Sequence, residues 1–231
     1  MGNRWWTRLR DLAIWAHLGK DLRIEWRSKD AMHAMLFFAL LVVVLFSLAF
    51  DPTRDSSRQI AGGVLCVAVL FAAVQALNQA WTRELRHQVL DAQRMTPAPA
   101  SALYLGKVLA NFLFLLVVEA VLAPVFAIFY NLHPLGNGWL LFAILPLGSW
   151  ALVANGTFFA ALSLRARSRE MLLPLLLLPI FLPALLAMVL ATSAVLAGDS
   201  EPGLWIRMLA GYDIIFTVLS VLLFETVLHA E

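Results

Sequence analysis

The chain has 231 residues, of which 61% are hydrophobic and 14% are charged, and its formal net charge at pH 7 is +2. A soluble domain of this length could not hide so much apolar surface from water, so the composition excludes the ordinary soluble class and favours lipid as the solvent. The small net charge gives no reason to expect nucleic acid as a partner.

Residues 1–32 are predicted to form an amphipathic arm that lies on the membrane. On a helix, one face would carry Trp5, Trp6, Leu9, Leu12, Ala13 and Ala16. Tryptophan at headgroup depth and an apolar face are typical of interfacial helices. Charges are scattered through the arm and an apolar signal core is missing, so a cleavable signal peptide is not expected. A solvated arm remains the alternative.

Residues 33–231 are predicted to form one transmembrane domain of six helices. A spanning helix needs about 20 mostly apolar residues. The six runs that meet this requirement cover residues 34–50, 60–80, 102–130, 139–164, 171–196 and 204–228. Lipid offers no hydrogen-bond partners, and the strands of a barrel would be shorter and would alternate in polarity. The expected fold class is therefore an all-α integral membrane protein.

The distribution of Lys and Arg predicts the orientation. Of 17 such residues, seven lie before His33, four lie between the second and third spans, and three lie between the fourth and fifth. Positive charge concentrates in cytoplasmic loops, so the N-terminus is expected in the cytoplasm. An even number of spans then returns the C-terminus to the same side.

The segment from about residue 82 to 95 is predicted to be a short amphipathic helix on the cytoplasmic side. Apolar side chains share one face and charged ones the other, and Thr96-Pro97 ends the pattern. Such a helix between two spans has the form of a docking element for a partner. The alternative is a connector that only rests on the headgroups.

Polar residues inside the spans are few. Glu119 is expected to be the only acid well inside a span, at a cost of about 2.5 kcal/mol or more. It is interpreted either as part of a moving interface or as a carboxyl that is protonated, bonded to Asn111, or bonded to a neighbouring span. Asn78 and Asn155 are interpreted as interhelical hydrogen-bonding residues. Without a second buried acid, a proton relay has little support.

Prolines are concentrated in the fifth span, at Pro174, Pro179 and Pro183. Each removes a helical hydrogen bond and can kink the helix. The fifth span is therefore predicted to bend, as a hinge or as a static kink.

Taken together, dispersed motifs from about residue 18 to 228 resemble the CcmB family, the membrane subunit of the cytochrome c maturation ABC transporter. The motifs are Lys20-Asp21-Leu22-Arg23-Ile24-Glu25-Trp26-Arg27-Ser28-Lys29, Asn78, Arg83-Glu84, Leu90-Asp91, Tyr104-Leu105-Gly106-Lys107, Asn111, Glu119, Phe129-Tyr130-Asn131, Arg165-Ala166-Arg167-Ser168-Arg169-Glu170, Leu172-Leu173-Pro174 and Tyr212-Asp213-Ile214-Ile215-Phe216.

The resemblance implies an ABC-2-like permease subunit in the bacterial inner membrane, present in two copies. It would work with the ATPase subunit CcmA, with CcmC and CcmD, and with the haem chaperone CcmE, in haem delivery or in release of the haem-loaded chaperone. The amphipathic segment then becomes an ATPase-coupling helix, with Arg83, Glu84, Leu85, Arg86, Val89, Leu90 and Asp91 as its candidate contacts. No catalytic, metal or cofactor site is expected in this chain, since partners would handle ATP and haem.

The sequence agrees with ATP hydrolysis by a partner subunit, because this chain contains no G-x-x-x-x-G-K-[ST] phosphate loop. Gly106-Lys107 lacks the upstream glycine and the following hydroxyl. The chain is thus expected to be a transporter subunit rather than an enzyme. Two alternatives stay open, namely an ABC-2-type exporter of lipid or another solute, and a membrane scaffold for assembly that transports nothing.

Overall fold

A computed structural model describes the backbone of residues 3–50, 55–86, 99–130, 138–163, 169–198 and 201–229, and the side chains of residues 13–50, 60–80, 99–130, 138–163, 177–198 and 201–226. Within these ranges the regular elements are all helical. They are α1 (Asn3–Ser28), α2 (Asp30–Ala49), α3 (Asp55–Arg86), α5 (Ala100–Phe129), a short 3-10 helix (Gly138–Leu140), α6 (Leu141–Leu162), α7 (Arg169–Ala197) and α8 (Gly203–His229).

Six of the described helices are long and apolar enough to cross a membrane, which confirms the predicted fold class. The spanning parts are Asp30–Ala49, Ile60–Ala80, Ala100–Phe129, Gly138–Leu162, Leu177–Ala197 and Gly203–Thr226. Each overlaps one predicted span. The chain is a multi-pass membrane protein.

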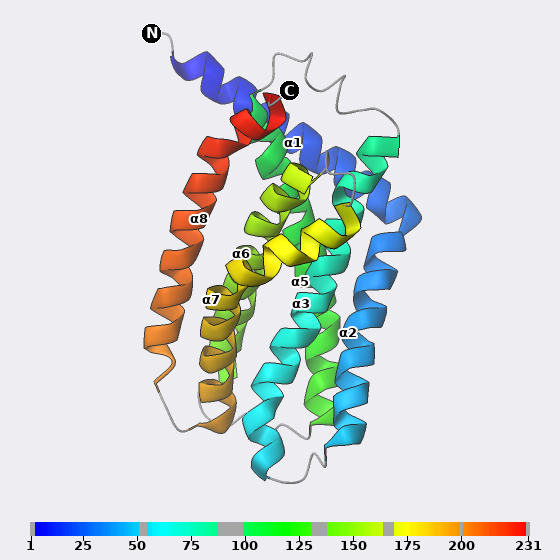
Figure 1. Cartoon of the computed structure of the whole chain (residues 1–231), viewed down its shortest axis with the longest axis vertical. Helices are drawn as coiled ribbons and strands as arrows, with labels where there is room; N and C mark the ends of the chain where they lie inside the picture. Colours follow the sequence, from blue (N-terminus) through cyan, green and yellow to red (C-terminus); the bar gives the residue numbers. More distant parts are fainter. Residues whose placement is uncertain are drawn as a thin grey trace.

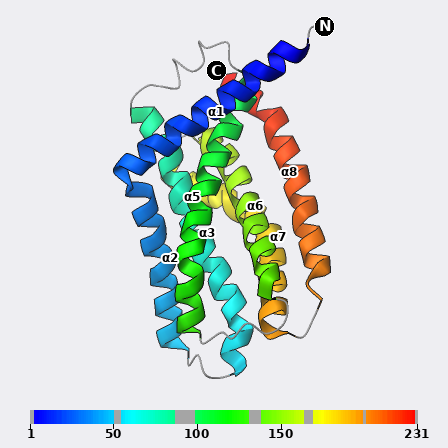
Figure 2. The same cartoon turned by 180° about the vertical axis from the view of Figure 1, so that it is seen from behind.

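The six spanning helices run along the long axis of the molecule, and α1 lies obliquely across one end (Figures 1 and 2). We call this end the α1 end. Both chain termini lie there, and α2 and α5 begin there, whereas α3 reaches it at Arg86. The opposite end, where α2 and α5 finish and α8 starts, is the far end.

The centre of the bundle is formed by α3 and α6, whose spanning parts are each 61% buried, whereas that of α8 is 17% buried. Small residues make the central packing close, because membrane helices associate through van der Waals contact rather than hydrophobic expulsion. Gly62 of α3 is the clearest case. A Cβ atom there would lie 2.8 Å from the backbone nitrogen and 2.9 Å from the Cα of Ser193 on α7.

The helix α7 is bent, as the prolines predicted. In Figure 1 its first part, drawn in yellow, runs obliquely across the bundle before the rest turns toward the far end. The hydroxyl of Tyr212 on α8 donates a hydrogen bond to the carbonyl oxygen of Ile180, 2.7 Å away, between Pro179 and Pro183. A neighbouring helix thus contacts the backbone of α7 within the proline-containing part of the helix.

Replacing Tyr212 by phenylalanine is expected to destabilise the protein by about 1 to 2 kcal/mol, because it removes the donor to Ile180 and the acceptor of a hydrogen bond from Asn155. The matched control is Tyr130→Phe. The Tyr130 hydroxyl is buried and has no hydrogen-bond partner among the described residues, so its removal should be neutral or stabilising. Thermal unfolding in detergent compares the two variants, and equal melting temperatures would contradict the role given to Tyr212.

A single residue, Lys29, separates α1 from α2, and its φ of 56° lies in the left-handed region. The turn between α1 and α2 is stabilised by the Glu25 carboxylate, which accepts a hydrogen bond from the backbone N–H of Met32 at 3.1 Å. The side chain of Glu25 is buried. The direction of α1 is therefore set by the start of the first spanning helix.

Candidate functional site

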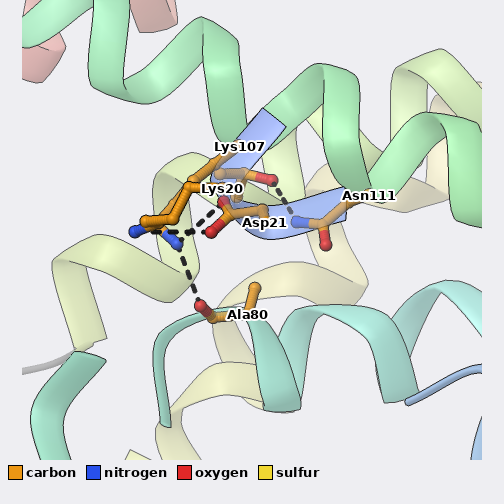
Figure 3. A network of polar contacts seen from close by, with 6 residues as sticks. Lys20, Asp21, Ala80, Lys107 and Asn111 are labelled. Atoms are coloured by element: carbon orange, nitrogen blue, oxygen red, sulfur yellow. Dashed lines mark hydrogen bonds and ion pairs between the residues drawn. The ribbon is translucent and has the colours of Figure 1, made fainter. Parts of the chain in front are cut away.

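Among the described residues, a buried lysine lies at the α1 end of the bundle. Lys107 of α5 is 2% exposed. Its ammonium lies 3.5 Å from Oδ2 of Asp21 on α1 and donates a hydrogen bond to the carbonyl oxygen of Ala80 on α3, at 3.1 Å. Lys20 approaches the other oxygen of the same carboxylate at 3.4 Å, and Figure 3 shows both lysines beside Asp21. We call this group of four residues the junction.

The junction exists because α1 packs closely on α5. Gly106 precedes Lys107, and a Cβ atom on Gly106 would lie 2.7 Å from Cβ of His17 and 3.3 Å from the carbonyl oxygen of Ile14. Only a glycine lets the two helix surfaces meet at this distance. The contact brings the next turn of α1, with Lys20 and Asp21, within reach of Lys107.

A buried ammonium is stable only when carboxylate or carbonyl oxygens replace the water that it has lost. Lys107 takes these oxygens from two other helices. The junction therefore joins α1, α3 and α5 at one point. From Ala80, α3 continues to Arg86.

The predicted coupling segment begins within α3. Residues 82–86 extend α3 without a break, and the side chains of Arg83, Glu84, Leu85 and Arg86 lie outside the described residues. Val89, Leu90 and Asp91 lie outside them entirely. The predicted docking contacts therefore stay predictions. The helix that leads to them is α3, whose Ala80 carbonyl accepts the hydrogen bond from Lys107.

The polar residues predicted inside the spans are placed as follows. Glu119 accepts a hydrogen bond from the hydroxyl of Ser149 on α6, so the neighbouring span supplies its partner. The amide nitrogen of Asn111 donates to Oγ1 of Thr157, also on α6, at 3.5 Å.

The side chain of Asn155 makes two hydrogen bonds. It donates to the carbonyl oxygen of Ala151 and to the hydroxyl of Tyr212, at 2.9 and 3.3 Å. Asn78 is exposed on α3.

The prediction that Glu119 is the only acid inside a span is wrong. Asp213 lies ten residues from the start of α8 at Gly203, as Glu119 lies ten residues from the end of α5 at Phe129. At 1.5 Å per residue each is about 15 Å from the far end of its helix. Asp213 is buried, and neither carboxylate oxygen has a partner among the described residues.

No group of three His, Cys, Asp or Glu side chains within the described ranges could hold a metal ion. His133 lies outside those ranges. Cys66 is buried, and its Sγ lies 3.7 Å from Oγ1 of Thr192.

The sequence profile of the family described as CcmB protein matches residues 12–230. This chain belongs to the CcmB family. Two proteins named Heme exporter protein B are similar to it along most of their length. That of Rhodobacter capsulatus is 32% identical over 171 residues, covering 74% of this chain and 78% of the relative. That of Pseudomonas aeruginosa is 29% identical over 202 residues, covering 87% and 90%.

The CcmB match extends from α1 through α8, so it includes the junction and all six spanning helices. From the sequence alone, Lys107 is one of the four basic residues between the second and third spans, which are predicted to be cytoplasmic. In the structure it lies in the second turn of α5 with its side chain buried. Sequence reasoning therefore missed the junction, although both Asp21 and Lys107 fall within motifs that carried the resemblance to CcmB proteins.

Proposed function

We propose that this chain is the membrane permease subunit of an ABC transporter complex in cytochrome c biogenesis. In this proposal a partner ATPase of the CcmA type hydrolyses ATP, and the chain transmits the resulting motion to haem delivery or to release of a haem-loaded chaperone. Membership of the CcmB family and the name of its relatives support the haem-related role.

The observation that carries the coupling role is the junction. A transducer must pass a displacement from its docking surface into its spanning helices through rigid, packed contacts. Lys107 lies on α5 and connects it with α1 and with α3 at Ala80, six residues before the end of the helix that leads to the predicted docking segment. A push on α3 at this end would therefore reach three helices at once.

The α1 end is assigned to the cytoplasm in this proposal, within the bacterial inner membrane. The support is the excess of Lys and Arg in the arm and in the loops that join helices at this end. Both termini lie there as well. The proposed assembly contains two copies of the chain, two ATPase subunits, and CcmC, CcmD and CcmE as the haem-handling partners.

The test is purification of a tagged chain co-expressed with its candidate ATPase, followed by assay of ATP hydrolysis. Changing Glu84 and Arg86 together to alanine is expected to reduce the bound ATPase severalfold, because both lie on the charged face of the predicted docking segment. The matched control changes Glu201 and Arg207, an exposed acid and base at the far end.

Retention of the ATPase by the control and its loss from the Glu84/Arg86 variant would support the proposal. Equal retention by both variants would contradict the docking assignment. A folded chain that binds no ATPase at all would favour the assembly scaffold. Hydrolysis that is stimulated by lipids or other solutes and is indifferent to the haem chaperone would favour an ABC-2-type exporter.

A further inference from the structure

The buried acid of α8 has no part in the proposed coupling role. Asp213 is 7% exposed, and neither of its carboxylate oxygens has a hydrogen-bond partner among the described residues. An ionised carboxyl in such a place costs far more free energy than a neutral one, because it loses its hydration and receives neither a donor nor a cation in exchange. The charge of Asp213 must therefore be compensated or removed.

The helices that pack against α8 bring no cation to this depth. They are α5, α6 and α7. The described side chains of α6 and α7 include no titratable group, and those of α5 include Tyr104, Lys107 and Glu119. Glu119, which lies at about the same depth as Asp213, is an acid and already accepts a hydrogen bond from Ser149. Lys107 lies 12 residues from Glu119, about 18 Å along α5 toward the α1 end.

The other titratable groups in the described part of α8 are Arg207, Tyr212 and Glu225. Arg207 is exposed and lies six residues before Asp213, about 9 Å nearer the far end. The hydroxyl of Tyr212 donates its hydrogen bond to the carbonyl oxygen of Ile180. Glu225 is a second acid. A proton on Asp213 itself removes the charge without a cavity, a cation or any further ligand.

Asp213 lies between two hydrogen bonds that join α8 to α6. One residue before it, the hydroxyl of Tyr212 accepts a hydrogen bond from Asn155 at 3.3 Å. Four residues after it, Oγ1 of Thr217 accepts one from the indole N–H of Trp150 at 3.0 Å. Because these bonds hold the two helices together on both sides of the carboxyl, water can reach an ionised Asp213 only when α8 moves away from α6.

The position of α8 allows such a movement. Its spanning part is 17% buried, the smallest fraction among the six described spans. It lies at the edge of the bundle in both views (Figures 1 and 2). A helix with few buried contacts separates from its neighbours at a lower cost in free energy than a central one.

We propose that Asp213 is a proton-binding site that controls the packing of α8 on α6. With the proton bound, the carboxyl is neutral and α8 stays packed. When the proton passes to water, the remaining carboxylate requires hydration, and α8 separates from α6. Uptake of a proton from water restores the neutral acid and the contact. The site does not depend on the proposed coupling function and can be tested without the ATPase.

The first experiment measures the infrared absorption of the full chain, reconstituted in lipid at neutral pH. A protonated carboxylic acid has a carbonyl stretching band that an ionised carboxylate lacks. Glu119→Gln serves as the background, because it leaves Asp213 as the only acid well inside a described span. The band is expected in this background and should disappear when Asp213→Asn is added. A spectrum without the band, or a band that Asp213→Asn leaves unchanged, would overturn the proposal.

The second experiment measures the separation of α8 by thiol alkylation. Ser220 is 4% exposed and lies seven residues beyond Asp213 on the same face of α8, so Ser220→Cys places a nearly isosteric thiol in the packed surface. A membrane-permeant maleimide is applied at mildly acidic and at alkaline pH. The thiolate is the reacting form, so the rate rises with pH in any case. The matched control is therefore the same protein with Asp213→Asn.

The two proteins are expected to react equally at mildly acidic pH, and the one with Asp213 should react severalfold faster at alkaline pH. Cys66, a buried thiol on α3, is the internal control and should react alike in both proteins. An equal rate in the two proteins at alkaline pH would overturn the proposal. A parallel increase at Cys66 would also overturn it, since it would show general loosening of the bundle rather than movement of α8.

Discussion

Replacing Gly62 by alanine is expected to lower the melting temperature of the protein, whereas the same change at Gly63 should leave it unchanged or raise it. A Cβ atom at Gly62 would lie within 3 Å of the backbone of Ser193, which cannot move without shifting α7. At Gly63 the nearest atom is Cγ1 of Val189 at 3.9 Å, an ordinary contact. Overpacking costs about 1–3 kcal/mol, while alanine is favoured over glycine in a helix by about 1 kcal/mol.

The two variants have the same chemistry and adjacent positions on α3, so their difference isolates the contact with α7. Thermal unfolding in detergent, followed by intrinsic fluorescence or by loss of the monodisperse peak, measures it. Serine at position 62 should behave as alanine does, because its Cβ meets the same backbone. If Gly62→Ala were as stable as Gly63→Ala, the close approach of α3 and α7 would be wrong.

Replacing Asp21 by leucine is expected to destabilise the attachment of α1 by about 3 kcal/mol, because removing one partner of a buried pair strands the other. The group that loses its carboxylate is the ammonium of Lys107, whose side chain is 3% exposed and which keeps its hydrogen bond to the Ala80 carbonyl. The further change Lys107→Met should restore part of the loss, since an apolar pair can replace a buried ion pair at little net cost. The double variant is thus expected to be more stable than Asp21→Leu alone.

Limited proteolysis within α1 and thermal unfolding provide the measurements, and Lys20→Met is the control. Lys20 approaches the same carboxylate but is partly exposed, so its loss should cost less than about 1 kcal/mol. Purely additive effects of Asp21→Leu and Lys107→Met would mean that the two side chains are not coupled. Equal effects of the Lys20 and Lys107 changes would mean that burial does not determine the strength of the contact.

The spanning helices could be predicted from the sequence because a bilayer sets their length and polarity. The second predicted span, residues 60–80, lies within α3 (Asp55–Arg86). The bend in α7 was also predictable, since three prolines remove local hydrogen bonds wherever the helix packs. These features depend on residues that are close in sequence.

The junction could not be predicted in the same way, because it depends on residues that are far apart. Asp21 and Lys107 come together only through the fit of α1 on Gly106, and hydropathy treats both as charges near a membrane boundary. The close approach at Gly62 requires knowing that α7 is its neighbour. Asp213 is different, since its place well inside the sixth apolar run was visible in the sequence and should have marked it as a second buried acid.

The contact between α1 and α5 also sets an order of events during synthesis. His17 and Gly106 touch in the folded chain but are separated by roughly 90 residues. A ribosome adds about 5–20 residues per second, so α1 is complete roughly 4–16 s before Gly106 of its binding surface on α5 has been made. During that interval Leu18 and Asp21 have no α5 to pack against. The N-terminal helix therefore waits through three membrane insertions before it can dock, and the junction closes only after the third spanning helix is in place.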